Sequence, residues 1–264
     1  SFGRRALLIV DESFFVKNLD SKRTRSLRRL REYCGPTYVL CGTPAPNSPQ
    51  DIIQQFNIVD FGLTFNGLNI PDEREAALPV VRNAIEENGV FIRNLKEDVL
   101  PDLCEKRFQK IFIPLQPQQD RLYRAALKNL ILDLRSTNDE DFGQRITSFL
   151  AKRQALLQIC SNPSALTDGY EEVPAKMQAL ESLLTDIIVQ RGEKVIVWSY
   201  YTASIEGIMN RFSNFNPVRI DGTVTDINER RNSVDKFQND NETMLFVGNP
   251  AAAGAGITLH RARF

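Results

Sequence analysis

The sequence has few of the residues that build metal centres and nucleophilic triads. Its 264 residues include one histidine, His260, and four cysteines that lie far apart and form no CxxC pair. A cluster of histidine ligands is therefore excluded, and a Ser-His-Asp triad would have to use His260. The cysteines are expected to be reduced, buried thiols of an intracellular protein, because their spacing matches neither a zinc site nor a disulfide framework.

Long apolar runs and an excess of one charge are also missing. The clearest apolar run near the start, residues 6–10, is far shorter than the roughly 20 residues of a membrane helix, and no signal-peptide pattern is present. We therefore expect no membrane contact. Lys and Arg number 33, as do Asp and Glu, so the net charge is 0. This balance excludes a global electrostatic attraction to nucleic acid and leaves a local basic patch open.

Strand and helix patterns alternate at both ends of the sequence, whereas the middle is mostly helical. Residues 6–10 are a continuous apolar run, typical of a strand buried on both faces of a parallel sheet, and residues 37–41, 194–198 and 244–247 are further strand candidates. Helical spacing of apolar residues dominates between them. The predicted fold is α/β, with an α/β part over residues 1–66, a helical insertion over 67–190 and a second α/β part over 191–264.

Two acidic residues, Asp11 and Glu12, follow the first of these strands. Functional groups of parallel sheets gather at the carboxyl ends of the strands. Adjacent carboxylates there suit a nucleotide–Mg²⁺ site, where one holds the water shell of the metal and the other orients an attacking water. By itself, such a pair is more often only a solvated strand end.

Further segments of the sequence favour the nucleotide–Mg²⁺ site over a solvated strand end. The run DESFFVKN at 11–18 precedes CGTPAPN at 41–47, FIRNLKEDVL at 91–100 and LLQICSNP at 156–163. The runs RIDGT at 219–223, followed by Glu229 and Arg230, and GAGITL at 254–259 complete the series. Together they resemble the boxes of the SWI/SNF-type branch of superfamily-two helicase-like ATPases, including its D-E-S-H-x-x-K-N and L-T-G-T-P-x-x-N motifs.

The resemblance implies two RecA-like lobes, both incomplete here, joined by a helical insertion. ATP and Mg²⁺ would bind between the lobes, and double-stranded DNA would be their track. By the same resemblance, Asp11 would hold Mg²⁺ through water and Glu12 would position the hydrolytic water. The matching boxes also imply that Gly42, Thr43 and Phe14 couple the nucleotide to DNA. They imply nucleic-acid binding by Lys17, Gly254, Gly256 and Thr258. They place Arg219, Asp221 and Arg230 at the interlobe surface. Phe14 stands where the family usually has His, which weakens the prediction for coupling.

A strongly basic segment lies between the first two boxes. Residues 21–33 contain six basic side chains and one acidic one, with apolar residues at helical spacing. Such a helix suits contact with DNA phosphates through Arg25, Arg28 and Arg29. Most charge runs of this kind are simply solvated helix faces, so both interpretations stay open.

The phosphate-binding loop G-x-x-x-x-G-K-[ST] is missing from the sequence, and none of the 14 glycines is followed by Lys. The family's last box, with its arginine for the γ-phosphate, is missing too. Because the sequence begins with Ser1 and stops within a pattern, we expect a central piece of a longer ATPase that hydrolyses no ATP by itself. The run around Asn249–Ala253 suggests a bacterial or phage member.

Two other functions compete with a double-stranded DNA translocase. A non-catalytic scaffold that docks DNA or protein would explain the missing loop, whereas the intact Asp11 and Glu12 favour the ATPase. An RNA helicase of the same superfamily is disfavoured, because residues 96–100 and 159–163 resemble the translocase branch only. The helical insertion offers a surface for protein partners, although a spacer role is the simpler interpretation. The expected location is the cytoplasm, or the nucleus in a eukaryote.

Overall fold

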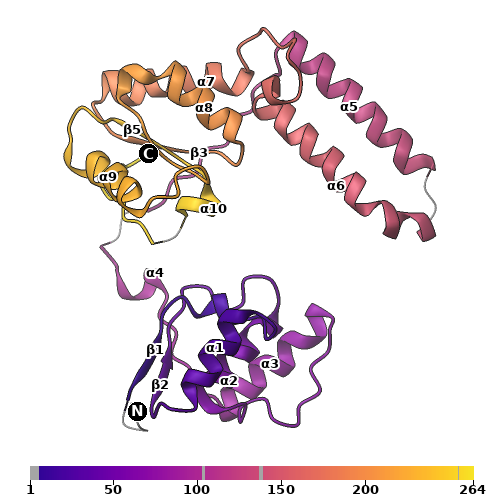
Figure 1. Ribbon diagram of the computed structural model, residues 1–264, viewed down its shortest axis with the longest axis vertical. Coiled ribbons are helices and arrows are strands. Elements are labelled where there is room, and N and C mark those ends of the chain that lie inside the picture. The colour runs from indigo at the N-terminus through magenta and orange to yellow at the C-terminus, as the bar shows by residue number, and fades with distance from the viewer. Residues whose placement is uncertain (1–5, 103–104, 137–138, 255) are drawn as a thin grey trace. The chain divides into compact units, whose positions relative to one another are not determined.

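The structure, a computed structural model, describes residues 6–102, 105–136, 139–254 and 256–264, with the side chains of 133–147 outside that description. The chain forms two compact units, Ser1–Arg107 and Phe108–Phe264, each considered separately below (Figure 1). Both contain a parallel sheet with helices, which confirms the predicted α/β fold class. No helix of the described residues is long and apolar enough to cross a membrane.

The first unit is built on two short parallel strands, β1 (Leu8–Val10) and β2 (Thr37–Val39). Leu8 pairs with Thr37 and Val10 with Val39. Because the strands run in the same direction, their carboxyl ends lie at one edge of the sheet. Whatever follows Val10 is therefore brought beside whatever follows Val39.

Helices of the first unit begin where the sequence supplies capping groups. The Ser21 hydroxyl accepts a hydrogen bond from the Thr24 N–H and starts α1 (Lys22–Arg31). Ser48 and Asp51 form a capping box that opens a 3₁₀ helix (Pro49–Ile52), which continues into α2 (Ile53–Asp60). Another 3₁₀ helix, Ser13–Val16, follows β1. Two further α-helices, α3 (Arg74–Asn88) and α4 (Lys96–Val99), follow α2.

The core of the first unit lies between α2 and α3, and α2 also packs against β2. Its buried members are Ile52, Phe56, Phe65, Val81 and Ala84. The ring of Phe56 meets that of Phe65 edge-on, at 5.5 Å between centroids. This packing of α2 onto β2 brings side chains of α2 close to the segment that follows the strand.

The prediction that residues 6–10 are buried on both faces is wrong for the first unit. Leu8 and Val10 are half-buried, whereas Ile9 is 57% exposed and Tyr38, its partner across the strand pair, is 60% exposed. Side chains alternate across a strand, so one face of this two-stranded sheet is covered and the other is open within the unit.

The second unit contains a three-stranded parallel sheet in the order β3–β5–β4. The strands are β3 (Val195–Trp198), β4 (Val218–Ile220) and β5 (Leu245–Gly248). The strand predicted at 244–247 is present as β5, and all four residues of this central strand are buried. Leu245 and Val247 join the core on one face, and Phe246 joins the core on the other.

Helices cover both faces of this sheet (Figure 1). One face packs against α7 (Ala175–Leu184), its π-helical extension Thr185–Gln190 and α8 (Thr202–Arg211). The other packs against α9 (Ile227–Asn239) and α10 (Pro250–Ala253). The Asp226 carboxylate accepts hydrogen bonds from the Asn228 and Glu229 N–H groups, at 2.6 and 3.0 Å, and so caps α9.

A helical hairpin precedes the sheet of the second unit. Its helices, α5 (Pro117–Ser136) and α6 (Asp139–Ser161), lie side by side (Figure 1). Gln119, at the start of α5, is fully buried and donates from Nε2 to the Ile159 carbonyl, at 2.6 Å, near the end of α6. Short 3₁₀ helices at Pro163–Ala165 and Ser213–Phe215 complete the unit.

Gly248 occupies a position of the central strand that has no room for a side chain. A Cβ atom there would lie 2.5 Å from the Trp198 ring and 3.1 Å from the Phe246 ring. We expect Gly248→Ala to lower the free energy of unfolding by about 1–3 kcal/mol, because the Trp198 ring would have to move. Chemical denaturation measures this, with Gly222→Ala, which meets nothing within 4 Å, as the control. Equal stabilities of the two variants would contradict the packing.

Candidate functional site

The acidic pair lies on a left-handed turn directly after β1. Glu12 has φ 49° and ψ 48°, a backbone conformation that costs a residue with a side chain about 1–3 kcal/mol. The Asp11 carboxylate accepts a hydrogen bond from the Glu12 N–H at 2.8 Å, which stabilises the turn. Both side chains are exposed. The turn ends the strand abruptly and presents two carboxylates at the edge of the sheet.

The box after β2 lies beside this turn. Ser13 is fully buried, and its N–H donates to the carbonyl oxygen of Leu40 at 3.0 Å. Gly42 and Thr43 follow and are exposed. The structure thus brings the acidic pair and the Gly-Thr-Pro segment together, as expected from the parallel strand pair.

A buried amide joins the two boxes. Gln55 of α2 accepts a hydrogen bond from the Ser13 hydroxyl at 2.6 Å and donates to the Pro44 carbonyl at 2.5 Å. Sequence reasoning missed Gln55, because a single glutamine within an amphipathic helix carries no pattern. Its partners are 42 and 11 residues away along the chain, so only the tertiary structure identifies it.

Phe14 and Lys17 pack close to this site. The ring of Phe14 lies 4.1 Å from that of Phe15, and Phe14 is half-buried. The Lys17 ammonium lies 3.2 Å from the Asp51 carboxylate. Burial raises the pKa of Asp51, but hydrogen bonds from the Asn47 N–H and from Lys17 outweigh it and hold that pKa below the ordinary value. Lys17 is therefore paired within its own unit.

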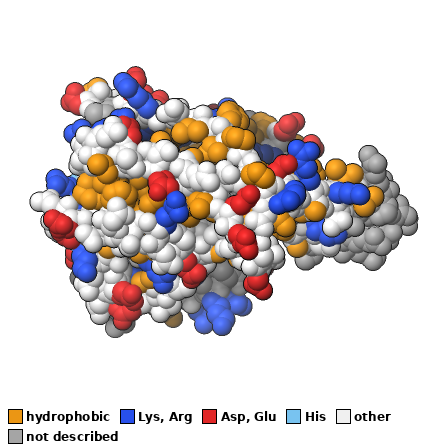
Figure 2. All heavy atoms as spheres, turned by 90° about the horizontal axis from the view of Figure 1, so that it is seen from above, with side chains coloured by type: hydrophobic (Ala, Val, Ile, Leu, Met, Phe, Trp, Pro, Cys, Tyr) orange, Lys and Arg blue, Asp and Glu red, His pale blue; other side chains and the backbone are white. Residues whose placement is uncertain are grey.

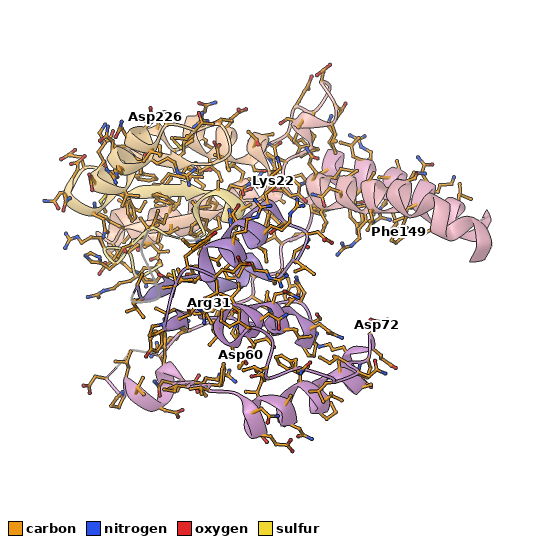
Figure 3. All side chains as sticks on the ribbon, turned by 60° about the horizontal axis from the view of Figure 1, so that its bottom comes forward. Lys22, Arg31, Asp60, Asp72, Phe149 and Asp226 are labelled. Carbon is orange, nitrogen blue, oxygen red and sulfur yellow. The ribbon has the colours of Figure 1, made fainter. Side chains whose placement is uncertain are left out.

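The basic segment forms α1, and its arginines fall into two groups. Arg25, Arg28 and Arg29 are exposed and available to a ligand. Arg31 is only 8% exposed, at the opposite end of α1 from Lys22 (Figure 3). Its guanidinium donates to the carbonyls of Ile58, Cys34 and Val59, at 2.8–3.0 Å, and lies 4.1 Å from the centre of the Phe61 ring. Arg31 thus ties the last turn of α2 to α1.

The predicted interlobe residues surround the carboxyl end of β4. Asp221 is 1% exposed, and its Oδ1 accepts from the Thr223 N–H and hydroxyl, at 2.8 and 2.6 Å. Burial raises the pKa of Asp221, but these bonds and the nearby charge of Arg219 outweigh it, so the pKa stays below its ordinary value. Its Oδ2 is buried without a partner among the described residues.

The two arginines of this box bond within the second unit. Arg219 donates to the Thr223 hydroxyl at 3.2 Å. Arg230 donates to the carbonyls of Val224 and Ala252 and so ties the start of α9 to α10. The box is therefore a hydrogen-bonded turn at the carboxyl edge of the sheet. Its hydrogen bonds connect the end of β4 with α9 and α10.

The glycine-rich segment follows α10. A Cβ atom on Gly254 would lie 2.3 Å from the Pro250 carbonyl oxygen, so the protein's own backbone requires a glycine there. Gly256 has φ +75°, a conformation that favours glycine. Thr258 is exposed. The glycines therefore have a structural reason that the sequence pattern alone does not indicate.

The charges and ligand types limit the kind of metal site that is possible. Among the residues that the structure describes, no group of three His, Cys, Asp or Glu side chains is placed to hold a metal ion. Asp11 offers an exposed carboxylate, which fits a metal held mainly by water and phosphate oxygens. On the face shown in Figure 2, acidic, basic and apolar side chains are interspersed.

Comparisons with known proteins agree with the order of the boxes. The SNF2-related domain family matches residues 3–165, and the helicase conserved C-terminal domain family matches residues 175–264. The chain is 23% identical to the ISWI chromatin-remodeling complex ATPase ISW1 of Saccharomyces cerevisiae, covering 96% of this chain and 24% of that protein. It is 25% identical to the DNA repair and recombination protein RAD54 of the same yeast, covering 96% of this chain and 32% of that protein.

A solved structure shows the same fold. The Sulfolobus solfataricus SWI2/SNF2 ATPase core in complex with dsDNA is 22% identical, with a TM-score of 0.50, over 97% of this chain and 56% of that one. The α/β units described above thus have the fold of a SWI2/SNF2 ATPase core. The chain spans about a quarter of the length of the first yeast relative and about a third of the second.

Replacing Arg31 tests which arginines of α1 are structural. We expect Arg31→Met to lower the free energy of unfolding by about 1–3 kcal/mol, because the buried carbonyls of Ile58 and Val59 would lose their donor. Arg28→Met, on the exposed face of the same helix, is the control and should change it by less than about 0.5 kcal/mol. Urea denaturation measures both. A similar small effect for both variants would contradict the role of Arg31.

Proposed function

The chain belongs to the SNF2-related family of helicase-like ATPases, and from that premise we propose that it is the central part of an ATP-dependent motor that translocates along double-stranded DNA. The observation that carries this proposal is the pairing of two boxes at one sheet edge. Asp11 and Glu12 lie on a strained turn beside Gly42 and Thr43, joined through buried Ser13.

The acidic pair suits the hydrolysis of a nucleoside triphosphate. Bound Mg²⁺ would neutralise charge on the phosphates and hold them in place, and Asp11 would hold its water shell. The Glu12 carboxylate would orient the attacking water and accept its proton. Glu12 has a left-handed backbone conformation, and a hydrogen bond from its own N–H to the Asp11 carboxylate stabilises it. Rigid placement of this kind lowers the barrier by orienting the reactants.

Coupling to DNA is proposed for the segment after β2 and for the second unit. Gly42 and Thr43 are exposed next to the acidic pair, and half-buried Phe14 lies in the box of the acidic pair, where its ring contacts that of Phe15. Arg219, Asp221 and Arg230 are proposed to face the other lobe.

DNA contact is proposed for the exposed arginines of α1 and for the glycine-rich segment. Arg25, Arg28 and Arg29 are exposed on one helix, which suits the neutralisation of successive phosphates. Gly254, Gly256 and Thr258 would approach the nucleic acid with little side-chain bulk. Lys17 is already paired with Asp51, so its contribution is proposed to be smaller. A protein that acts on DNA would work in a bacterial cytoplasm or a nucleus.

This chain is proposed to hydrolyse no ATP by itself. It has no G-x-x-x-x-G-K-[ST] loop, so the phosphates would lack their backbone cradle and lysine. Tests of hydrolysis therefore use the full-length protein. A scaffold that docks DNA or protein remains the alternative if that protein hydrolyses no ATP. The α5–α6 hairpin is the proposed surface for protein partners.

Replacing Glu12 tests the hydrolytic role. In the full-length protein, we expect Glu12→Gln to lower DNA-stimulated ATP turnover by about 100-fold or more, because the water loses its base. Binding of ATP should persist, since the amide keeps the shape of the side chain. Glu32→Gln, an exposed residue at the end of α1, is the control. Normal turnover in Glu12→Gln would remove Glu12 from the mechanism.

Replacing the three exposed arginines of α1 tests the DNA contact. With Arg25, Arg28 and Arg29 all changed to Gln, we expect weaker binding of duplex DNA. The slope of log K against log salt concentration should become less negative by up to about 2.7, because each lost phosphate contact removes about 0.9. Fluorescence anisotropy over a salt series measures the slope. An unchanged slope would show that α1 is a solvated face.

A further inference from the structure

Gln55 is a buried polar residue with no part in the proposed chemistry. It is 2% exposed, yet its side chain makes three hydrogen bonds. Oε1 accepts from the Ser13 hydroxyl at 2.6 Å, and Nε2 donates to the carbonyls of Pro44 and Asp51, at 2.5 and 3.1 Å. Burial of an amide is unfavourable unless its groups are paired, and all of these pairs lie within or next to the two boxes.

The direction of these hydrogen bonds follows from the partners. The Pro44 and Asp51 carbonyls only accept, so the amide nitrogen of Gln55 must face them. Its oxygen then faces Ser13, whose hydroxyl donates. A continuous chain of bonds therefore runs from Ser13, after the acidic pair, through Gln55 to Pro44, after Thr43.

Ser13 is the next residue after Glu12, so a movement of Ser13 also moves the backbone of Glu12. Ser13 is fully buried, and both its N–H and its hydroxyl are engaged by the segment after β2, through Leu40 and through Gln55 with Pro44. The neighbouring Glu12 has a left-handed backbone that persists only where its surroundings hold it. A shift of Pro44 would therefore break the bond to Gln55 or move Ser13, and either change alters the turn that carries Glu12.

A second link runs parallel to the first. Lys17 pairs with Asp51 at 3.2 Å, and Asp51 accepts from the N–H of Asn47 at 2.9 Å. Asp51 lies in the 3₁₀ helix before α2, and Gln55 lies one helical turn further on, near the start of α2. The start of α2 thus contacts both boxes twice.

We propose that Gln55 is a positioning residue that transmits movement of the Gly42–Thr43–Pro44 segment to Glu12. The inference rests on the proposed function, because it assumes that the segment after β2 responds to DNA. It predicts that DNA stimulates hydrolysis only while the bonds from Ser13 to Gln55 and from Gln55 to Pro44 are intact.

The test compares ATP turnover of the full-length protein with and without saturating duplex DNA. The variants are Gln55→Met, Ser13→Ala and the double variant. Gln54→Met is the matched control, because Gln54 is the neighbour on the same helix and makes no hydrogen bond to either box among the described residues. Melting temperatures are recorded for every variant, so that loss of stability is separated from loss of coupling.

We expect the ratio of DNA-stimulated to DNA-free turnover to fall about fivefold or more in each single variant, the lower end of coupling between sites. The double variant should fall no further, because both changes break one chain of bonds. Gln54→Met should keep the wild-type ratio. If Gln55→Met does not fold, Ser13→Ala, which removes a single hydroxyl, decides the question.

Two results would overturn the inference. One is a wild-type ratio in Ser13→Ala and Gln55→Met together with lowered melting temperatures, which is the result of a purely structural amide. The other is a double variant whose loss is the product of the single losses. Failure of the proposed function is distinct, because it appears in the wild-type protein as an absence of DNA-stimulated turnover before any variant is compared.

Discussion

The parallel pairing of β1 with β2 is the constraint on which the candidate site depends. The register Val10 to Val39 ends both strands at one edge, and the segments after them are therefore neighbours. It also places the Ser13 N–H opposite the Leu40 carbonyl. A slip of one residue would turn every strand side chain to the other face and break this contact. The acidic pair and the Gly-Thr-Pro segment would then no longer be joined.

The site combines a strained element with a rigid support. Glu12 holds an unfavourable backbone conformation, and its exposed side chain gains no packing in return. The adjacent Ser13 is buried and bonded twice, so the support offsets the strain. In the second unit, buried Asp221 and half-buried Arg230 fix the carboxyl edge of the sheet in a similar way. In both units, buried hydrogen bonds thus hold the segment at the carboxyl edge of the sheet.

Strong local patterns predicted much of this structure, and contacts between distant segments explain the rest. The apolar run at 244–247 correctly indicated a strand, and its burial on both faces is explained by its central place in the sheet. The similar run at 6–10 misled, since its sheet has only two strands and one covered face. Arg31 looked like its neighbours in a basic helix, although the end of α2 buries it. Gln55 carried no signal, because its partners come from two other segments.

The central claim is movement along duplex DNA driven by ATP, and the dependence of ATP turnover on duplex length tests it most directly. If the full-length protein is a translocase, it spends more time stepping along a longer duplex and less time dissociating and rebinding. Turnover at saturating DNA should therefore rise with duplex length and reach a plateau. Turnover that is absent, or that is the same on short and long duplexes, would contradict a translocating motor.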